Sequence, residues 1–187
     1  LIPGCVGASP MQNIGAYGVE VKEVFHELTA LHKFDFSLQK FNNSDCEFGY
    51  RESIFKNKYK DQFVITDVTY RLNKEPHFNI EYGAIRQELG KNHVRDLSIQ
   101  SIANAVMAIR SAKLPDPAKI GNAGSFFKNP VISRELFLKV QEKFPEVKYF
   151  EVSLTEVKVP AGWLIEHAGL KGYRKDDAGV HKNQALV

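Results

Sequence analysis

One hydroxyl group stands in a sequence context that could transfer a proton. Ser125 follows a turn sequence, Asn-Ala-Gly at 122–124, and precedes Phe126 and Phe127. The small residues before Ser125 let a ligand approach the backbone closely, and the phenylalanines supply an apolar wall. A hydroxyl in this setting could give or take a proton with little competition from water. The same sequence is also typical of the start of a core strand, so this segment alone leaves both interpretations open.

A second candidate site is the loop formed by the first eighteen residues, which is rich in glycine and proline. Its glycines do not have the Gly-x-Gly-x-x-Gly spacing of a Rossmann dinucleotide site, and it contains no Gly-Lys-Ser/Thr phosphate loop. With Gln12 and Asn13, such a loop can still offer backbone N–H groups to an anion such as pyrophosphate. A tight surface connection is the alternative interpretation.

Together with several other blocks, these segments resemble the UDP-N-acetylenolpyruvoylglucosamine reductases, flavoenzymes of peptidoglycan synthesis. The matching blocks are Ile2–Pro10, Gln12–Gly18, Phe48–Phe55, Lys113–Pro117, Gly121–Pro130, Ala161–Ile165, Gly169–Gly172 and Val180–Val187. Each block is a weak pattern, but their order and spacing are specific. The resemblance implies an oxidoreductase that uses FAD and NADPH to reduce the enolpyruvyl ether of a UDP-sugar to UDP-N-acetylmuramate, in support of cell wall growth, cell shape and division.

The resemblance implies catalytic roles for Ser125 and Arg51. After hydride reaches the terminal carbon of the enolpyruvyl group, Ser125 would protonate the adjacent carbon, and Arg51 would stabilise the charge on the neighbouring carboxylate. A guanidinium suits this role because it grips a carboxylate through two parallel bonds and keeps its charge. A surface ion pair with Glu52 or Asp61 is the alternative interpretation of Arg51.

The resemblance also implies which residues bind the two larger ligands. The sugar nucleotide would be held by Tyr82, Lys113, Asn129, Lys171 and Gln184. The flavin would be held by Gly4, Val6, Gly7, Ala8, Gln12, Asn13, Gly15, Ala16 and Tyr17. Tyr82 resembles the mobile tyrosine that folds over the diphosphate in the longer of the family's two subtypes. Taken alone, each lysine is more typical of a solvated side chain, and Trp163 is more typical of a core residue.

Members of this family begin with a further α/β domain that holds a flavin pyrophosphate loop, and they end with a segment that carries a catalytic glutamate. This sequence matches neither part. We therefore expect a central and C-terminal fragment that is colourless as purified and inactive alone. A sugar-nucleotide-binding module without catalysis is the alternative. A flavin oxidase of a related superfamily is a third possibility, and the Gly121–Pro130 block together with Lys113–Pro117 argues against it.

Composition indicates a folded, soluble protein. Hydrophobic residues make up 43% and charged residues 25% of the 187 residues, which is close to the globular average. No apolar run approaches the roughly 18 residues of a membrane span, and we expect a cytoplasmic monomer. The net charge of +3 comes from mixed local charges, which predicts a solvated surface rather than a nucleic-acid site. Cys5, Cys46 and the scattered histidines have no metal-ligand spacing, so no metal is expected.

The pattern of apolar residues predicts an α+β fold in two parts. Residues 1–96 would form part of a flavin-binding domain, and residues 97–187 a substrate-binding domain. In the first part, alternation at Val24, Leu28 and Ala30, and then at Phe34, Phe36 and Leu38, predicts a hairpin over 20–40 that turns near His32. A long strand over 62–72 with a slip near Asp67 and a further strand over 78–82 are also expected.

The second part reads as three helices and a strand. Ser98 can cap a helix over 98–112 whose apolar face is Ile99, Ile102, Val106 and Ile109. A helix over 133–144 again starts at a serine and presents Leu136, Val140 and Phe144. Pro160 and Gly169 bracket a helix over 160–168. Residues 179–187 are expected to form a strand.

Overall fold

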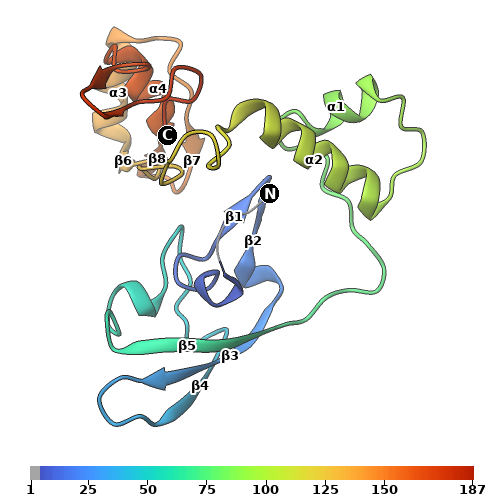
Figure 1. Cartoon of the computed structure of the whole chain (residues 1–187). Helices are drawn as coiled ribbons and strands as arrows, with labels where there is room; N and C mark the ends of the chain where they lie inside the picture. The colour runs from blue at the N-terminus through green and yellow to red at the C-terminus, as the bar shows by residue number, and fades with distance from the viewer. Residues whose placement is uncertain (1–4) are drawn as a thin grey trace. The chain divides into compact units, whose positions relative to one another are not determined.

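The computed structural model describes residues 5–187, which fold as two compact units (Figure 1). Unit 1 is Leu1–Ile109 and unit 2 is Arg110–Val187. Each unit combines antiparallel sheets with helices, so the predicted α+β class is confirmed. The units are defined by packing and divide within one helix, whereas the predicted division at residues 96 and 97 concerns ligand-binding roles and stays a prediction.

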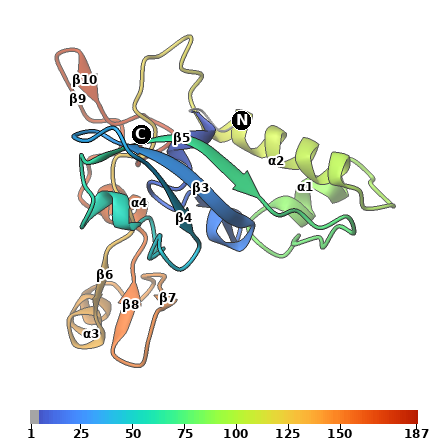
Figure 2. The same ribbon diagram turned by 90° about the horizontal axis from the view of Figure 1, so that it is seen from below.

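The sheet of unit 1 contains β3 (Phe25–His32), β4 (Leu38–Asn42) and β5 (Phe63–Tyr70). Strand β3 lies in the middle and pairs antiparallel with both neighbours (Figure 2). Next to Asp67 the register shifts, because Thr29 pairs with Asp67 while Ala30 pairs with Ile65. Thr66 is the extra residue of this bulge. The predicted hairpin, long strand and slip are therefore confirmed.

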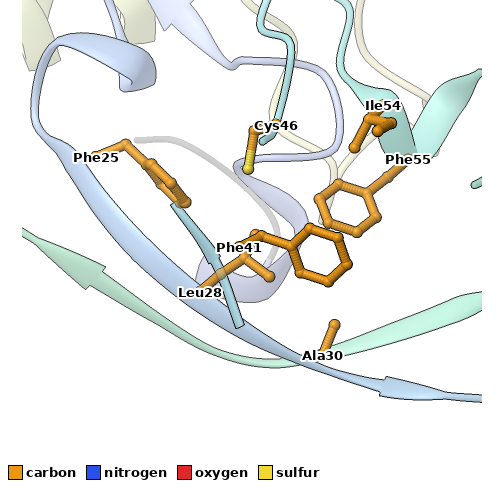
Figure 3. Packing of buried hydrophobic residues seen from close by; sticks show 7 residues of the cluster. All are labelled: Phe25, Leu28, Ala30, Phe41, Cys46, Ile54 and Phe55. Atoms are coloured by element: carbon orange, nitrogen blue, oxygen red, sulfur yellow. The ribbon is translucent and has the colours of Figure 1, made fainter. Parts of the chain in front are cut away.

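The core of this sheet lies on one face of β3 (Figure 3). Leu28 and Ala30 are fully buried there and pack with Phe25, Phe41, Cys46, Ile54 and Phe55. Ile54 and Phe55 come from the short 3-10 helix η3 (Ile54–Lys56). Phe34, Phe36 and Leu38, whose alternation predicted the second strand of the hairpin, are all exposed. The chain reverses over residues 33–37, so Phe34 and Phe36 lie in the turn, and the buried residue of β4 is Phe41.

The loop before this sheet contains three short elements. A 3-10 helix, η1 (Val6–Ala8), is followed by a two-stranded hairpin of β1 (Gly15–Ala16) and β2 (Val19–Glu20), and then by η2 (Val21–Glu23). The hairpin turn is Tyr17-Gly18, and both residues have positive φ, 55° and 79°. Positive φ at both central residues is the geometry of a tight type I′ turn, which fixes the path of the predicted flavin loop.

Two helices complete unit 1. They are α1 (Ile85–Lys91) and α2 (Ile99–Lys113), which lie side by side and share a core of Ile85, Leu89, Ala105 and Ile109. Helix α2 was predicted, and its Ser98 hydroxyl accepts a hydrogen bond from the Ser101 N–H at 3.0 Å. Its predicted face member Ile99 is exposed instead. The α1 helix was not predicted. The strand expected over 78–82 is wrong, since these residues pair with no strand and Ile80 packs against the helices.

The core of unit 2 lies between a small sheet and one helix. The strand order is β6 (Val131–Ser133), β8 (Glu156–Lys158), β7 (Phe150–Glu151), and α3 (Arg134–Lys143) packs on β6 and β8. The buried residues are Phe137, Val147, Val157 and Val159. Ser133 caps α3 as predicted, because its hydroxyl accepts the Leu136 N–H. Of the predicted apolar face, Val140 packs against this core, whereas Leu136 is exposed and Phe137 is the buried residue instead.

The last part of unit 2 holds α4 (Ala161–His167) and a hairpin of β9 (Arg174–Lys175) and β10 (Ala178–Gly179). Helix α4 is bracketed as predicted, with Gly169 at φ 70° after it, and Trp163 packs against the core. The strand expected over 179–187 is wrong. Strand β10 ends at Gly179, and the residues after it form turns with a bridge between His181 and Gln184. No helix among residues 5–187 is both long and apolar enough to cross a membrane.

Candidate functional site

Arg51 lies in a tight turn of unit 1 and points at the predicted flavin loop. The turn is closed by a bridge between Gly49 and Glu52, and Arg51 has φ 56°. Its Nη2 donates to the carbonyl oxygen of Gly15, and its Nη1 donates to that of Asn13 at 3.4 Å. Its ion pair within the described residues is with Glu20, at 3.6 Å, rather than with Glu52 or Asp61. The guanidinium is thus held on the backbone of the loop.

The Asn13 side chain forms hydrogen bonds to several segments around Arg51. Its side chain is fully buried. The Nδ2 group donates to Glu20 Oε2 and to the Gly49 carbonyl, each at 3.0 Å, and Oδ1 accepts the Lys22 N–H at 3.0 Å. The amide therefore joins the loop, the β1–β2 hairpin and the Arg51 turn. Every polar atom of this side chain therefore has a protein partner.

The other residues predicted to hold the flavin differ in exposure. Gly4 lies outside the described residues. Val6, Ala8, Gln12 and Ala16 are exposed, whereas Gly7, Gly15 and Tyr17 are partly buried. A Cβ atom at Gly15 would lie 2.6 Å from the Val19 carbonyl oxygen, so only glycine fits where the Arg51 side chain meets the hairpin. The exposed members are accessible to a ligand.

Tyr82 of the predicted substrate site meets the flavin loop within unit 1. Its ring packs edge-on against Tyr17, with centroids 6.4 Å apart and an interplanar angle of 77°. The next residue, Gly83, has φ 65°, and Tyr82 remains 49% exposed. One residue predicted to bind the sugar nucleotide and one predicted to bind the flavin are therefore in contact.

Ser125 lies in an open turn of unit 2. The turn is closed by the Asn122 Oδ1, which accepts the Gly124 N–H at 3.1 Å, and Gly124 has φ 72°. Residues 121–130 belong to no strand, Ser125 is exposed, and Phe126 and Phe127 are 75% and 61% exposed. The alternative that this segment starts a core strand is therefore wrong.

An apolar pocket of about 240 Å³ adjoins this serine turn. Phe126 and Phe127 form one side of it, and the Phe126 N–H donates to the Leu186 carbonyl at 2.8 Å. The remaining lining residues are Ile165, Leu170, Gly179, Val180, Ala185, Leu186 and Val187. The predicted apolar wall beside Ser125 thus exists as a surface pocket rather than as buried core.

The remaining predicted substrate residues of unit 2 are held to different degrees. Asn129 Oδ1 accepts the Ala161 N–H at 2.9 Å and so caps α4. Lys171 Nζ is 2.6 Å from Glu166 Oε1. Lys113 is exposed at the C-terminal end of α2, and Gln184 is partly buried in the bridge with His181. Asn129 and Gln184 belong to segments next to the Ser125 turn, because Phe126 pairs with the segment that contains Gln184.

The predicted site residues therefore form two groups. Arg51, Tyr82 and the flavin loop belong to unit 1, and Ser125, Lys113, Asn129, Lys171 and Gln184 belong to unit 2. Among residues 5–187 no three His, Cys, Asp or Glu side chains gather as a metal site requires. Cys46 is a fully buried core residue. Its burial, and then the nearby Asp45, raise the pKa of its thiol to about 12.

Two residues of this region were missed from the sequence. Glu20 pairs with Arg51, and Ser53, which is fully buried, donates to the Met11 carbonyl at 2.6 Å. The sequence contains one indication that Glu20 is structurally held. Glu20 and Glu23 have the spacing of a capping box, and they form one at η2. Ser53 offered no local signal, since its partner lies 42 residues away along the chain.

Comparison with known proteins gives a consistent result. Residues 116–187 match the family model described as UDP-N-acetylenolpyruvoylglucosamine reductase, C-terminal domain. Curated reductases of that name cover the whole chain, at 57% identity in Flavobacterium johnsoniae and 51% in Pseudomonas syringae pv. syringae. The chain spans only 56% and 55% of these relatives.

A solved structure shares the fold. The UDP-N-acetylenolpyruvylglucosamine reductase from Thermus caldophilus matches with a TM-score of 0.59 at 22% identity. The match covers 99% of this chain and 49% of that one. At this identity, the likeness supports the α+β architecture alone.

Proposed function

We propose, from its similarity to UDP-N-acetylenolpyruvoylglucosamine reductases, that the chain is part of such a reductase and carries its charge-stabilising and proton-donating residues. The reaction is reduction of the enolpyruvyl ether of UDP-N-acetylglucosamine-enolpyruvate to UDP-N-acetylmuramate for peptidoglycan. The observation that carries the proposal is the placement of Arg51, whose guanidinium is bound to the backbone of the loop proposed to hold the flavin.

The proposed cofactors are FAD and NADPH. The loop residues Val6, Ala8, Gln12 and Ala16 are exposed, and the positive φ of Asn13 and Tyr17 turns the loop backbone. These features fit a loop that binds a flavin mainly through its backbone. When bound, the flavin supplies the redox chemistry, and the protein supplies position and electrostatics.

Arg51 is proposed to bind the carboxylate of the substrate. Charge accumulates on that carboxylate and its α-carbon when hydride adds to the terminal carbon. A guanidinium fixed beforehand stabilises this charge without reorganising during the reaction. Arg51 meets that condition, because two backbone carbonyls and one carboxylate fix its direction.

Ser125 is proposed to deliver the proton to the same α-carbon. Its hydroxyl proton would move to that carbon, and solvent would later restore it. An alkyl hydroxyl is a weak acid, so it can act only towards a strongly basic carbon, which this reaction provides. The apolar pocket beside Ser125 would favour transfer once bound ligands exclude water.

The proposed substrate is a UDP-sugar, held by Tyr82, Lys113, Asn129, Lys171 and Gln184. The lysines suit a diphosphate and the amides suit a sugar or uracil rim. In unit 2, Asn129 already uses its carbonyl oxygen to cap α4, so it would bind the ligand through its amide nitrogen. We further propose that the protein acts as a cytoplasmic monomer.

The test is an assay of the full-length protein encoded by the gene that contains this sequence. NADPH oxidation should depend on UDP-N-acetylglucosamine-enolpyruvate and yield UDP-N-acetylmuramate. Binding of the UDP-sugar without any product would instead support the alternative, a binding module. The 187-residue chain itself should be colourless, because it spans about half of its relatives and the rest is proposed to complete the flavin site. A stoichiometric flavin absorbance band in the purified chain would contradict that part.

A further inference from the structure

The carboxylate of Glu20 is the electrostatic centre of the Arg51 region. Its Oε1 lies 3.6 Å from Arg51 Nη1. Its Oε2 accepts from Asn13 Nδ2 at 3.0 Å and lies 3.2 Å from Lys22 Nζ. The carboxylate also accepts the backbone N–H of Glu23 in the capping box. With its side chain 24% exposed, Glu20 is more firmly held than an ordinary surface carboxylate.

Arg51 is held through both its guanidinium and its backbone. Its guanidinium donates to the carbonyls of Gly15 and Asn13 and faces Glu20. Its backbone is constrained too, since φ is 56° and Lys56 Nζ donates to the Arg51 carbonyl at 2.9 Å. A non-glycine residue in this region of φ costs energy and persists only where its surroundings determine it. The network therefore fixes both the base and the tip of the side chain.

The distances indicate that Glu20 orients Arg51 and still leaves its guanidinium able to bind another carboxylate. A charge-assisted N–H···O bond is about 2.7–2.9 Å long, and the Arg51–Glu20 separation of 3.6 Å is longer. Asn13, Lys22 and the Glu23 N–H share the negative charge of the carboxylate. Arg51 thus keeps donor capacity for a second carboxylate, that of a ligand.

We propose that Glu20 is a positioning residue that aims the Arg51 guanidinium at the substrate carboxylate. This inference rests on the proposed function and adds a residue to it. Glu20 does not itself contact the reacting atoms in this scheme. Its effect passes through Arg51, so removing its charge should matter only while the arginine is present.

The test compares four full-length proteins: the wild type, Glu20→Gln, Arg51→Lys and the double variant. Glu20→Gln should lower kcat about 10- to 100-fold, because a small misplacement of a charge-stabilising group costs up to about 100-fold. KM for the UDP-sugar should change by less than about threefold, because the lost interaction acts mainly in the transition state. In the Arg51→Lys background the same substitution should cost less than about threefold, since coupled residues are not additive.

The matched control is Glu151→Gln in unit 2, which removes another arginine partner, that of Arg134. It should leave kcat within about twofold, as expected for an exposed pair. Glu20→Asp, which keeps the charge on a shorter side chain, should recover part of the lost rate. Thermal unfolding of each variant separates a loss of folded protein from a loss of rate per folded molecule.

Three results would overturn the proposal. They are an unchanged kcat in Glu20→Gln, an equal loss with and without Arg51, and a rate loss fully accounted for by unfolded protein. If the wild type itself makes no UDP-N-acetylmuramate, the proposed function fails rather than this inference. The NMR signals of the Arg51 guanidinium then test the inference separately. They should be separate and slowly exchanging in the wild type and averaged in Glu20→Gln, and identical spectra would overturn it.

Discussion

Arg51 and Ser125, the two proposed catalytic residues, have opposite surroundings. Arg51 contacts two backbone carbonyls, a carboxylate and, across 5.2 Å, the ring of Tyr50. Ser125 lies exposed in a turn that contains an Asx hydrogen bond, beside phenylalanines that are themselves exposed. In unit 1, Arg51 is therefore held by a network of side chains and backbone groups, whereas in unit 2 Ser125 lies on an open surface.

This difference separates two ways of preparing a site. A charged group that stabilises a transition state gains from being fixed in advance. A hydroxyl that must protonate carbon gains from a dry environment, which an open pocket reaches only when ligands cover it. We therefore expect substitutions around Arg51 to reduce stability and activity together. Substitutions at the Ser125 turn should reduce activity alone.

The largest effect is expected for Ser125→Ala in the full-length protein. General acid catalysis contributes about 100- to 10,000-fold, so kcat should fall by at least about 100-fold. The melting temperature should stay unchanged, because the exposed hydroxyl makes no contact that folding needs. Single-turnover product formation and thermal unfolding check the two parts.

Ser153→Ala is the matched control for that substitution. Ser153 is another exposed turn serine of unit 2, and its Oγ accepts the Thr155 N–H at 3.2 Å. This variant should keep full activity. Normal turnover in Ser125→Ala would remove Ser125 from its proposed role, and a marked loss of stability there would break the contrast between the two surroundings.

How far the sequence could predict this molecule depends on the range of the interactions. Local signals succeeded: the serine caps at Ser98 and Ser133 begin helices, and the slip near Asp67 is a bulge. The β3–β4 hairpin was predicted, but Phe34 and Phe36, whose alternation predicted its second strand, lie in the turn. Alternation cannot tell an inward strand position from a turn residue when the reversal itself contains apolar residues.

The candidate site shows the same division. The residue types at Ser125 and Arg51 suggested chemistry, and the family resemblance gave them roles. The network of Asn13, Glu20 and Ser53 was not visible, because its bonds join segments between 7 and 42 residues apart. Asn13 was predicted to hold a cofactor, and its side chain proves to be a buried connector. Nothing in a local pattern separates those two uses of an amide.

Asn13→Ala should have the next largest effect, on stability. It would leave the Lys22 N–H without its partner, and it would remove the bonds from Asn13 to Glu20 Oε2 and to the Gly49 carbonyl, which keeps the Glu52 N–H at 3.2 Å. A buried polar group left unpaired costs about 1–3 kcal/mol, so we expect a loss of about 3 kcal/mol in the free energy of unfolding. Urea denaturation of the 187-residue chain measures it.

Asn122→Ala is the control in the open turn of unit 2. It removes an exposed Asx bond, and surface substitutions usually change stability by about 0.5 kcal/mol or less. Equal losses in Asn13→Ala and Asn122→Ala would show that the two surroundings do not differ in the way proposed.

Tyr82→Phe tests whether the tyrosine acts through its hydroxyl or its ring. Phenylalanine keeps the edge-on contact with Tyr17, so folding should not change. Loss of a hydrogen bond to the diphosphate should weaken UDP-sugar binding by about 1–2 kcal/mol, since bonds to charged groups contribute about that much. Calorimetric titration and KM measure it. Intact affinity with a large fall in kcat would instead place Tyr82 at the proton-transfer step.

The smallest effect is expected for Asp35→Asn in the β3–β4 turn. This substitution tests whether the loss of stability depends on the unit in which a residue lies or on the exposure of that residue. Asp35 Oδ1 accepts the Ser37 N–H at 2.9 Å and the Ser37 hydroxyl at 2.8 Å, and it lies 2.7 Å from His32 Nδ1. These bonds, those from Ser37 first, lower the pKa of the carboxyl from its ordinary 3.8 to about 2.

Because the folded state has the lower pKa, the carboxylate stabilises the fold fully above the unfolded pKa and loses this contribution as the pH falls towards 2. The wild type should therefore be slightly more stable than Asp35→Asn at pH 6, and the difference should vanish between about pH 4 and pH 2. Thermal unfolding across that range checks it. If Asp35→Asn lost as much stability as Asn13→Ala, the size of the loss would depend on whether a residue lies in unit 1 and not on whether it is buried. A small, pH-dependent loss of stability in Asp35→Asn would instead show that burial, and not the unit, accounts for the difference between the surroundings of Arg51 and Ser125.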